Sequence, residues 1–436
     1  GSAGVDSAGQ TTNVAYATGD YSFAIGQGSV ASGFGSYAIG LADTASGPYA
    51  FAIGTKSAAK DYFSIAIGNR ATSNNHNAIA IGNYTTSSGY GSLAIGTLAN
   101  ASNGSIAIGS VTASGSISTA IGNGANASGY ASTAIGYFTT ASGQSATAIG
   151  ELSEASGQYS TAIGYNTSSE GMSSLALGHS TRASELYCTA LGVNTIASGY
   201  IATALGESTI ASGVASFSAG SSSLAIGNLS TSIGLCTVAK SYNCFVIGSY
   251  NDTLSTSSSY AWQDNDPLFL IGNGDVNNGR SNAVMVKKNG EVYFPDVYDD
   301  ETGITNRELF IDDQGKIGYT VSSRRYKTDI HMMENIDWFY KLQPVNFTYK
   351  NDSSNRKQYG LIAEEVQTLN PLFVSFNEKG EAETVLYSKF ISVLIKAVQD
   401  QNKIIADQKI ESDKQKQKIV DLEKRLGILE KKLSTE

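Results

Sequence analysis

The stretch Gly318–Ile330, GYTVSSRRYKTDI, places Ser322 and Lys327 five residues apart. A serine hydroxyl is a weak nucleophile and needs a base within hydrogen-bond reach. A lysine amine can act as that base only when burial or nearby positive charge lowers its pKa from about 10.4 towards neutrality. Arg324 and Arg325 could supply that charge. A bend in the chain or a neighbouring subunit must bring Ser322 and Lys327 together.

This stretch lies at a boundary of composition. Residues 1–250 contain 5 Lys and Arg, 9 Asp and Glu, and 37 of the 47 glycines, whereas the rest of the chain contains 24 Lys and Arg and 29 Asp and Glu. The net charge of −9 argues against a nucleic-acid partner, because phosphate binding needs a basic surface. There is no run of 18 apolar residues, so no membrane insertion is expected.

Cysteine and histidine usage gives little support to a metal or cofactor site. The three cysteines are odd in number and have no CxxC spacing, and the three histidines are scattered. We therefore expect no disulfide framework, no metal ion and no cofactor, and surface or packing roles for the histidines.

Residues 1–250 form a region of internal repeats. Ala-Ile-Gly or a close variant occurs eighteen times between Gly26 and Gly248, almost always 14 residues apart, with two steps of 13 and two of 7. Each unit therefore consists of two similar half-coils of a short strand and a tight turn, in which Gly supplies the positive φ. The Ile of each tripeptide is expected to point into a thin core, and stability to come from stacking many coils and chains.

Aromatic residues recur after the turn glycine in this region, at Phe34, Tyr90, Tyr130 and Tyr200. Packing between coils is the favoured interpretation, and stacking on sugar rings is the alternative. A calcium-binding roll is not expected because GGxGxD motifs are absent and carboxylates are few. The threonines are too irregularly spaced for a flat ice-binding face.

The repeats over about residues 15–250 resemble the left-handed parallel β-roll heads of YadA-type trimeric autotransporter adhesins, a motif also found in viral and phage fibres. The resemblance implies a homotrimer with its β-rolls side by side and an outer surface that binds a host cell-surface receptor, for which a glycan is one candidate.

Residues 251–321 predict a β-rich neck. The segments 268–274, 282–294 and 308–321 are expected to form short strands, with hairpin turns at Asn289-Gly290 and Gln314-Gly315. The acidic residues of this region are interpreted as turn residues rather than as a carboxylate site; they include Asp264, Asp266 and Asp275.

Residues 322–390 predict a small α+β domain, with a helix over 334–344, a strand over 345–350 and a strand that leads into a helix over 360–371. Residues 391–436 predict a coiled coil. Nine of its thirteen core positions are apolar: the a positions are Ile391, Val398, Ile405, Ser412, Ile419, Leu426 and Leu433, and the d positions are Leu394, Gln401, Gln408, Gln415, Leu422 and Leu429. Branched residues at a with Leu at d favour dimers. Several Gln residues at core positions weaken this preference, and the repeat region requires a trimer, so a trimeric coiled coil is expected.

Residues 322–436 resemble the C-terminal intramolecular chaperone of endosialidases and other phage tail spikes, a self-cleaving Ser/Lys peptidase family. The matching segments are SSRRYKTDI, YGLIAEEVQTLNP and YSKFISVLIKAVQDQNKII. The resemblance implies cleavage of the Val321–Ser322 bond, with Ser322 as nucleophile and Lys327 as base. Ser323 stands where the family usually has Asp, and Asp329 where it usually has Asn. Ser323 is a rival nucleophile, and a basic loop with an incidental serine is the non-catalytic alternative.

Three functions follow from these patterns. The favoured one is a trimeric viral or phage fibre for host attachment, located in the virion, whose chaperone part is released after cleavage. The alternatives are a glycan-degrading tail spike, which would need paired carboxylates in a groove, and a cellular trimeric surface adhesin. The fold class is mainly β: a trimeric parallel β-roll solenoid, a β-rich neck, an α+β chaperone domain and a coiled coil.

Overall fold

The computed structural model describes residues 14–295, 309–311, 316–350, 352, 354–377 and 379–434. The chain divides into two compact units, residues 1–302 and residues 303–436. We call them the solenoid unit and the C-terminal unit and describe each by itself.

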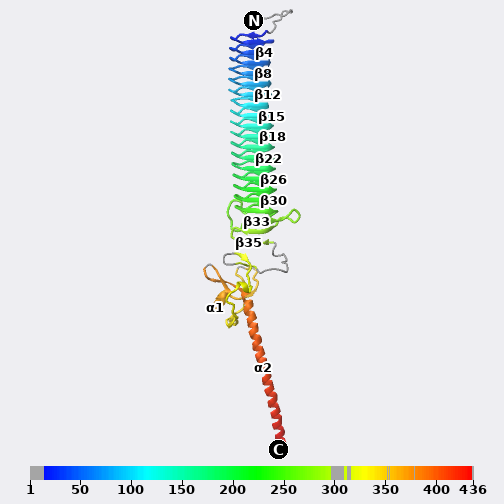
Figure 1. The fold of residues 1–436 in the computed structure, drawn as a ribbon, viewed down its shortest axis with the longest axis vertical. Coiled ribbons are helices and arrows are strands. Elements are labelled where there is room, and N and C mark those ends of the chain that lie inside the picture. The colour runs from blue at the N-terminus through cyan, green and yellow to red at the C-terminus, as the bar shows by residue number, and fades with distance from the viewer. Residues whose placement is uncertain are drawn as a thin grey trace. The chain divides into compact units, whose positions relative to one another are not determined.

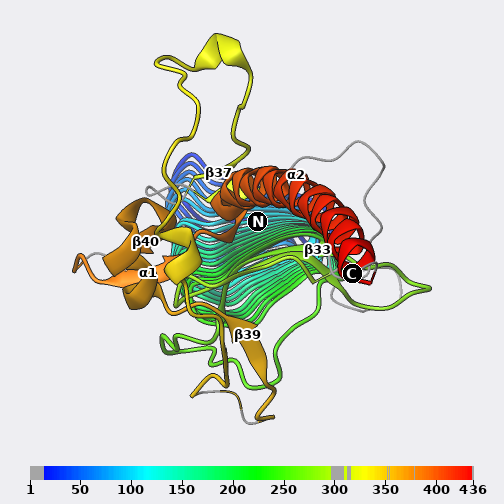
Figure 2. The same cartoon turned by 90° about the horizontal axis from the view of Figure 1, so that it is seen from below.

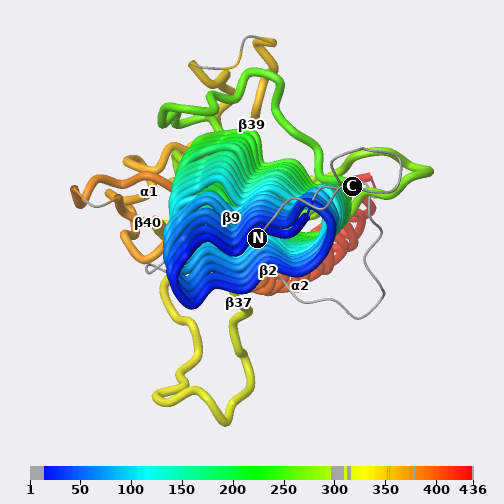
Figure 3. The backbone as a smooth tube through the Cα atoms, turned by 90° about the horizontal axis from the view of Figure 1, so that it is seen from above, coloured from blue at the N-terminus to red at the C-terminus, as the bar shows by residue number. Residues whose placement is uncertain are grey.

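The solenoid unit is a parallel β-solenoid whose coils lie one above another (Figures 1 and 3). Each regular coil contributes a strand of five residues to one stack and a strand of two residues to another. The register between neighbouring coils is 14 residues, so that Ala52 pairs with Ala66 and Gly54 with Gly68. This pairing confirms the predicted repeat.

The strands of the longer stack are β2 (Phe23–Ile25), β4 (Tyr37–Leu41), β6 (Phe51–Thr55), β8 (Ile65–Asn69), β10 (Ile79–Asn83), β12 (Leu93–Thr97), β14 (Ile106–Ala113), β15 (Thr119–Ala127), β16 (Thr133–Tyr137), β18 (Thr147–Glu151), β20 (Thr161–Tyr165), β22 (Leu175–His179), β24 (Thr189–Val193), β26 (Thr203–Glu207), β28 (Phe217–Ser221), β30 (Thr231–Leu235), β32 (Phe245–Ser249) and β33 (Pro267–Asn273). The strands of the shorter stack are β1 (Tyr16–Ala17), β3 (Val30–Ala31), β5 (Thr44–Ala45), β7 (Ala58–Ala59), β9 (Thr72–Ser73), β11 (Thr86–Ser87), β13 (Asn100–Ala101), β17 (Thr140–Ala141), β19 (Glu154–Ala155), β21 (Ser168–Ser169), β23 (Arg182–Ala183), β25 (Ile196–Ala197), β27 (Ile210–Ala211), β29 (Leu224–Ala225) and β31 (Val238–Ala239). The longer strands β14 and β15 take part in both stacks.

The irregular repeat steps do not interrupt the coil. Ala225 of the extra AIG tripeptide pairs with Ala211 of an ASG tripeptide, so Gly227 occupies the ASG position of an ordinary 14-residue coil. An AIG tripeptide can therefore stand at the ASG position, but the two half-coils are less similar than expected, because one contributes a strand of five residues and the other a strand of two. In the region of the 13-residue steps, the pairing of β14 with β15 shifts register between Ser110 and Thr112.

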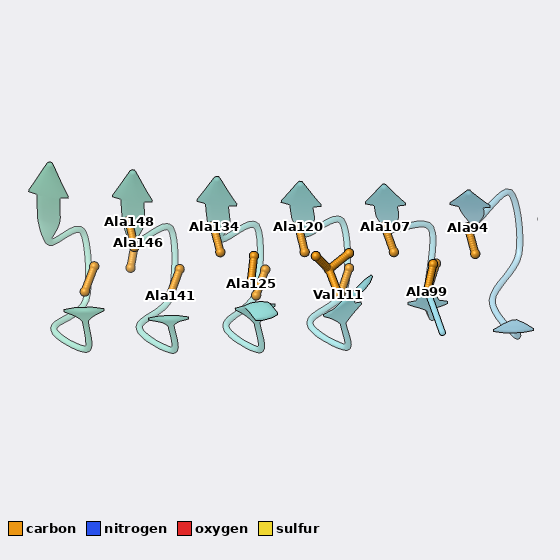
Figure 4. Packing of buried hydrophobic residues seen from close by; sticks show 14 of the residues in the cluster. Ala94, Ala99, Ala107, Val111, Ala120, Ala125, Ala134, Ala141, Ala146 and Ala148 are labelled. Carbon is orange, nitrogen blue, oxygen red and sulfur yellow. The ribbon is translucent and has the colours of Figure 1, made fainter. Parts of the chain in front are cut away.

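The core of the solenoid consists mainly of alanine, serine and threonine, and the prediction that the Ile of each tripeptide points inward is wrong. In β6, Ala52 is fully buried, whereas Ile53 is only partly buried. Side chains alternate along a strand, so an inward Ala places its Ile neighbour on the outer face. Figure 4 shows the alanines of successive coils, such as Ala94, Ala107 and Ala120, in one column.

The glycines serve close backbone approach more than turn conformation. Gly54, in an AIG tripeptide, has φ +137°, but Gly143, in an ASG tripeptide, has no positive φ. A Cβ added at Gly143 would lie 2.0 Å from the carbonyl oxygen of Gly157 in the next coil. Most left-handed turn positions hold other residues, including Tyr49 at φ 55° and Phe63 at φ 53°. The expectation that Gly supplies the turn's positive φ therefore holds for only some of the glycines.

An antiparallel extension closes the C-terminal end of the solenoid. β33 continues the parallel stack by pairing Phe269 with Phe245, and then pairs with β34 (Asn282–Lys287), which pairs with β35 (Val292–Tyr293). These elements confirm the strands predicted within 268–274 and 282–294. Gly290 has φ +90° in the predicted hairpin turn. The side-chain amide of Asn251 accepts a hydrogen bond from the backbone N of Val238 at 2.7 Å and donates one to the backbone O of Val238 at 3.0 Å. These two bonds take the place of the backbone pairing that one further strand would make.

The C-terminal unit begins with β36 (Phe310–Ile311) and β37 (Ile317–Gly318), an antiparallel pair inside the predicted segment 308–321. The turn predicted at Gln314-Gly315 lies outside the described residues. β38 (Val345–Phe347) pairs with β39 (Gln358–Gly360), which leads into α1 (Ala363–Leu369), as predicted. The short helix η4 (Pro371–Phe373) and the hairpin of β40 (Val374–Phe376) and β41 (Ala382–Val385) follow and were not predicted.

The helix predicted over 334–344 is wrong, because only the 3₁₀ turn η3 (Phe339–Lys341) forms there. The side chain of Asn335 accepts a hydrogen bond from the backbone N of Asp337 at 2.8 Å, which competes with helical pairing. Ile336 is buried with Val393, so tertiary packing fixes this segment.

The predicted coiled-coil segment forms one helix, α2 (Tyr387–Leu433). Near its start, Val393 and Ala397 are buried in the C-terminal unit. The apolar a and d side chains are exposed, as at Ile391, Leu394 and Leu422. None of the helices among the described residues is long and apolar enough to cross a membrane.

Candidate functional site

Ser322 and Lys327 lie in hydrogen-bond contact. The Nζ of Lys327 donates to the Oγ of Ser322 at 2.9 Å. The bend that the spacing required is the single turn η2 (Arg324–Tyr326), in which Tyr326 N donates to Ser323 O at 3.0 Å and Lys327 N to Arg324 O at 3.1 Å. One chain can therefore bring these two side chains together without a neighbouring subunit.

The loop that carries this pair is open to solvent. All residues from Val321 to Ile330 are exposed, and Figure 2 shows the loop, in yellow, extending away from α1 and β40 of its own unit. A shallow hollow beside it is lined by Phe310, Tyr319, Thr320, Val321, Ser322, Ser323, Arg325 and Tyr326. The Arg325 guanidinium lies 4.7 Å from the centroid of the Tyr326 ring, a cation–π contact within the lining of this hollow.

A second polar pair follows in the same loop, which the sequence analysis did not identify as functional. His331 Nε2 lies 2.6 Å from Asp329 Oδ1, and both side chains are exposed. Asp329 has φ 55°, a left-handed conformation that Asn and Asp adopt more readily than other non-glycine residues. The signal in the sequence was the short spacing DIH, which is common in loops and therefore carries little information.

The body of the C-terminal unit joins the start of α2 to the GLIAEEV segment. The hydroxyl of Tyr387 accepts a hydrogen bond from the backbone N of Leu361 at 2.8 Å. A Cβ at Gly360 would lie 2.6 Å from that hydroxyl oxygen, so a larger residue would displace the Tyr387 side chain. Val366 of α1 is buried with Val374 and Val385. The first residues of the long helix are thus fixed to the rest of the unit.

The acidic residues of the neck are turn and packing residues. Asp275 accepts from the backbone N of Asn277 and Asn278 at 2.7 Å each, and Asp264 accepts from the Trp262 indole at 3.1 Å. Asp266 is buried beside Lys288. Within the described part of the chain there is no group of three or more His, Cys, Asp or Glu that could hold a metal ion.

The exposed aromatics of the solenoid mostly pack against rings of neighbouring coils, as favoured above. Phe34 lies 5.4 Å from Tyr49 and Tyr200 lies 6.1 Å from Tyr187, both edge to face. Tyr90 stacks at 6.4 Å on His76. Among the described residues Tyr130 has no ring neighbour of this kind.

Two family models match the chain. The YadA head domain repeat matches at residues 15–29, 31–57, 45–71, 59–85, 73–99, 113–139, 141–167 and 190–216. The chaperone of endosialidase, a peptidase-related family, matches at residues 322–375, which begin at Ser322. No curated protein matches the chain. The chain thus joins head-type adhesin repeats to a C-terminal segment that matches the chaperone of endosialidase.

Proposed function

We propose that the protein is a homotrimeric viral or phage fibre for host attachment, and that its C-terminal unit drives trimer assembly and then cleaves the chain at Val321–Ser322. The 2.9 Å hydrogen bond between Lys327 Nζ and Ser322 Oγ carries the proposal. The hydroxyl that Lys327 contacts is that of Ser322, which favours Ser322 over Ser323 as the nucleophile.

The cleavage follows from the position of the serine beside the bond that breaks. Lys327, in its neutral form, takes the hydroxyl proton as Oγ of Ser322 bonds to the carbonyl carbon of Val321. The Val321–Ser322 C–N bond breaks, the proton passes to the Ser322 amine, and an ester joins the two residues. Water then hydrolyses the ester, which leaves a carboxylate on Val321 and a free amine on Ser322.

Assembly of three chains would exclude water from Ser322 and Lys327. Both side chains are exposed in one chain, whereas a lysine acts as a base more readily when water is excluded. The exposed a and d side chains of α2 offer a surface on which three chains can associate. Contact between three C-terminal units would bury the loop, so that cleavage follows assembly.

A cleavable chaperone is useful for a solenoid of this kind. Identical coils can pair in many registers, and parallel pairing between distant residues folds slowly. A C-terminal helix that associates first would align three chains and raise their local concentration. Cleavage would then make unfolding effectively irreversible, which is kinetic stability.

The two alternatives have weaker support. A glycan-degrading spike requires two carboxylates on either side of a bound sugar, and the solenoid's few acidic residues do not recur as pairs along the coils. A cellular adhesin shares the head repeats, so only the site of expression separates it from a virion protein.

A denaturing gel of the full chain tests the proposal. The wild type is expected to give two fragments that meet at Val321–Ser322, Ser322→Ala one intact band, and the control Ser323→Ala the wild-type pattern. Light scattering of Ser322→Ala should give the mass of three chains. An intact wild type, or equal cleavage in Ser322→Ala, would contradict self-cleavage, and a monomeric Ser322→Ala would contradict the assembly role.

A further inference from the structure

The first coils of the solenoid expose a cluster of aromatic rings on one edge. These residues occupy the two turn positions after the ASG glycine or its equivalent. Tyr90 is 67% exposed, and the others are 43–55% exposed. We call the cluster the aromatic edge; it consists of Phe34, Tyr49, Tyr62, Phe63, His76 and Tyr90.

The rings form two adjoining columns along the solenoid axis. In one column Phe34 lies 5.4 Å from Tyr49, and Tyr49 stacks on Phe63 at 5.2 Å with the planes 7° apart. In the other column His76 stacks on Tyr62 at 5.1 Å and on Tyr90 at 6.4 Å. Because the coils repeat at about 4.8 Å, the edge is a rigid ladder of rings.

The turns do not need these rings to form. Later coils place Gln144, Ser145 and Gln158 at equivalent positions. Ser145 N donates to Tyr130 O at 2.8 Å, just as Phe63 N donates to Pro48 O at 3.1 Å, and both residues have a φ of 53°. Polar residues therefore form the same turn, so folding does not require exposed rings on this edge. An exposed apolar surface that folding does not require points to a ligand.

Polar groups accompany the rings. The His76 Nδ1 lies 3.0 Å from a carboxylate oxygen of Asp61, whose other oxygen accepts from Tyr62 N at 2.8 Å. The hydroxyls of Tyr62 and Tyr90 form no hydrogen bond within the described residues. Tyr90 ends its column, because the next coil turns through Asn103 and Gly104, which carry no ring.

We propose that the aromatic edge binds a neutral oligosaccharide, with pyranose rings against Tyr90 and its neighbours and sugar hydroxyls on Asp61, Asn103 and the tyrosine hydroxyls. Ring faces with interspersed donors and acceptors suit sugars better than an apolar protein surface. The solenoid carries more acidic than basic residues, which disfavours an acidic glycan. This site rests on the proposed host-attachment function and gives it a ligand class.

The test uses the full chain on an array of neutral and acidic oligosaccharides. The triple variant Tyr62→Gln, His76→Gln and Tyr90→Gln places at each site the residue that the chain itself carries at 144 and 158. We expect the wild type to bind neutral oligosaccharides and the variant to bind at least about tenfold more weakly. The control Tyr130→Gln, which removes an isolated exposed ring, should bind as the wild type does.

Other results would overturn the inference. These are equal binding by the triple variant, binding to acidic glycans alone, or an altered oligomeric state, which would make the edge a contact between copies of the chain. If the triple variant does not fold, the single variant Tyr90→Gln decides the matter. Wild-type protein that attaches to host cells without binding the array would refute the sugar site and leave the attachment function intact.

Discussion

Lys327 reaches back across one 3₁₀ turn to place its Nζ 2.9 Å from the Oγ of Ser322. We predict that Lys327→Met slows self-cleavage by about 100-fold or more, the usual effect of removing a general base. Lys327→Arg should fail equally, because a guanidinium stays protonated and cannot accept the proton. Quantification of the fragments on a gel over time measures the rate.

The control for this prediction is Lys341→Met, which removes an exposed lysine elsewhere in the same unit. It should cleave as the wild type does. Cleavage of Lys327→Arg at the wild-type rate would show that the lysine only positions the loop.

Sequence reasoning found this pair because the motif is local. Five residues with one turn are enough to bring Ser322 and Lys327 together, so the contact depends little on the rest of the fold. Contacts between residues far apart in the sequence could not be predicted in this way. The contact of Tyr387 with Leu361 joins residues 26 apart, and nothing in the composition of either segment indicates it.

We predict that Gly143→Ala disrupts the solenoid far more than Gly91→Ala. The added methyl group at Gly143 would meet the backbone of the next coil at 2.0 Å, which only a shift of the coil can relieve. Gly91 has open space around its Cβ position, so alanine there costs only the left-handed conformation at φ +64°, about 1–2 kcal/mol. Circular-dichroism melting of both variants makes the comparison.

The expected outcome is a loss of folded protein or a large fall in the melting midpoint for Gly143→Ala alone. Midpoints are compared rather than free energies, because a repeat array does not unfold in one step. Similar midpoints for the two variants would contradict the close-approach role of the ASG glycine.

The same geometry explains where the sequence-based prediction of the fold succeeded and failed. The 14-residue period determines the register, and it could be recognised because nearly every coil repeats it. Which of Ala and Ile faces inward depends on the distance between the two strand stacks, and this distance is not encoded in a single coil. The preference for burying the larger side chain therefore gave the wrong answer at Ile53 and its equivalents.

We predict that the C-terminal end of the solenoid is destabilised less by removing both charges of the buried Lys288–Asp266 pair than by removing one of them. Lys288 Nζ lies 3.8 Å from an Asp266 oxygen, and the side chains are 0% and 6% exposed. Asp266→Asn leaves the ammonium uncompensated and should cost about 3–5 kcal/mol, whereas adding Lys288→Met should recover most of it. Protease digestion of residues 251–266 and thermal melting measure the effect.

Burial lowers the pKa of Lys288 most strongly, while Asp266 raises it. Without the carboxylate, Lys288 would lose its proton more readily, so Asp266→Asn should regain stability towards alkaline pH. The double variant should show no such gain. Equal sensitivity of both variants to protease would contradict the pairing.

Asp43 is a fully buried carboxyl in a core column that otherwise carries Ser29 and Ser57 at the neighbouring positions. Burial raises its pKa above 3.8, although the Ser57 N–H that it accepts at 2.7 Å acts in the opposite direction. The folded chain therefore holds this proton to higher pH than the unfolded chain. Stability contributed by Asp43 is lost as the pH rises from about 3.8 through the raised pKa.

The variant Asp43→Ser removes this pH-dependent loss of stability and keeps a hydroxyl that can accept a hydrogen bond from Ser57 N. The variant should melt at a higher temperature than the wild type at pH 7, with the difference shrinking as the pH falls towards 3.8. Other carboxyl groups titrate in this range, so the difference between the two proteins at each pH is the quantity to measure. A difference that stays constant with pH would mean that the buried carboxyl carries no such penalty.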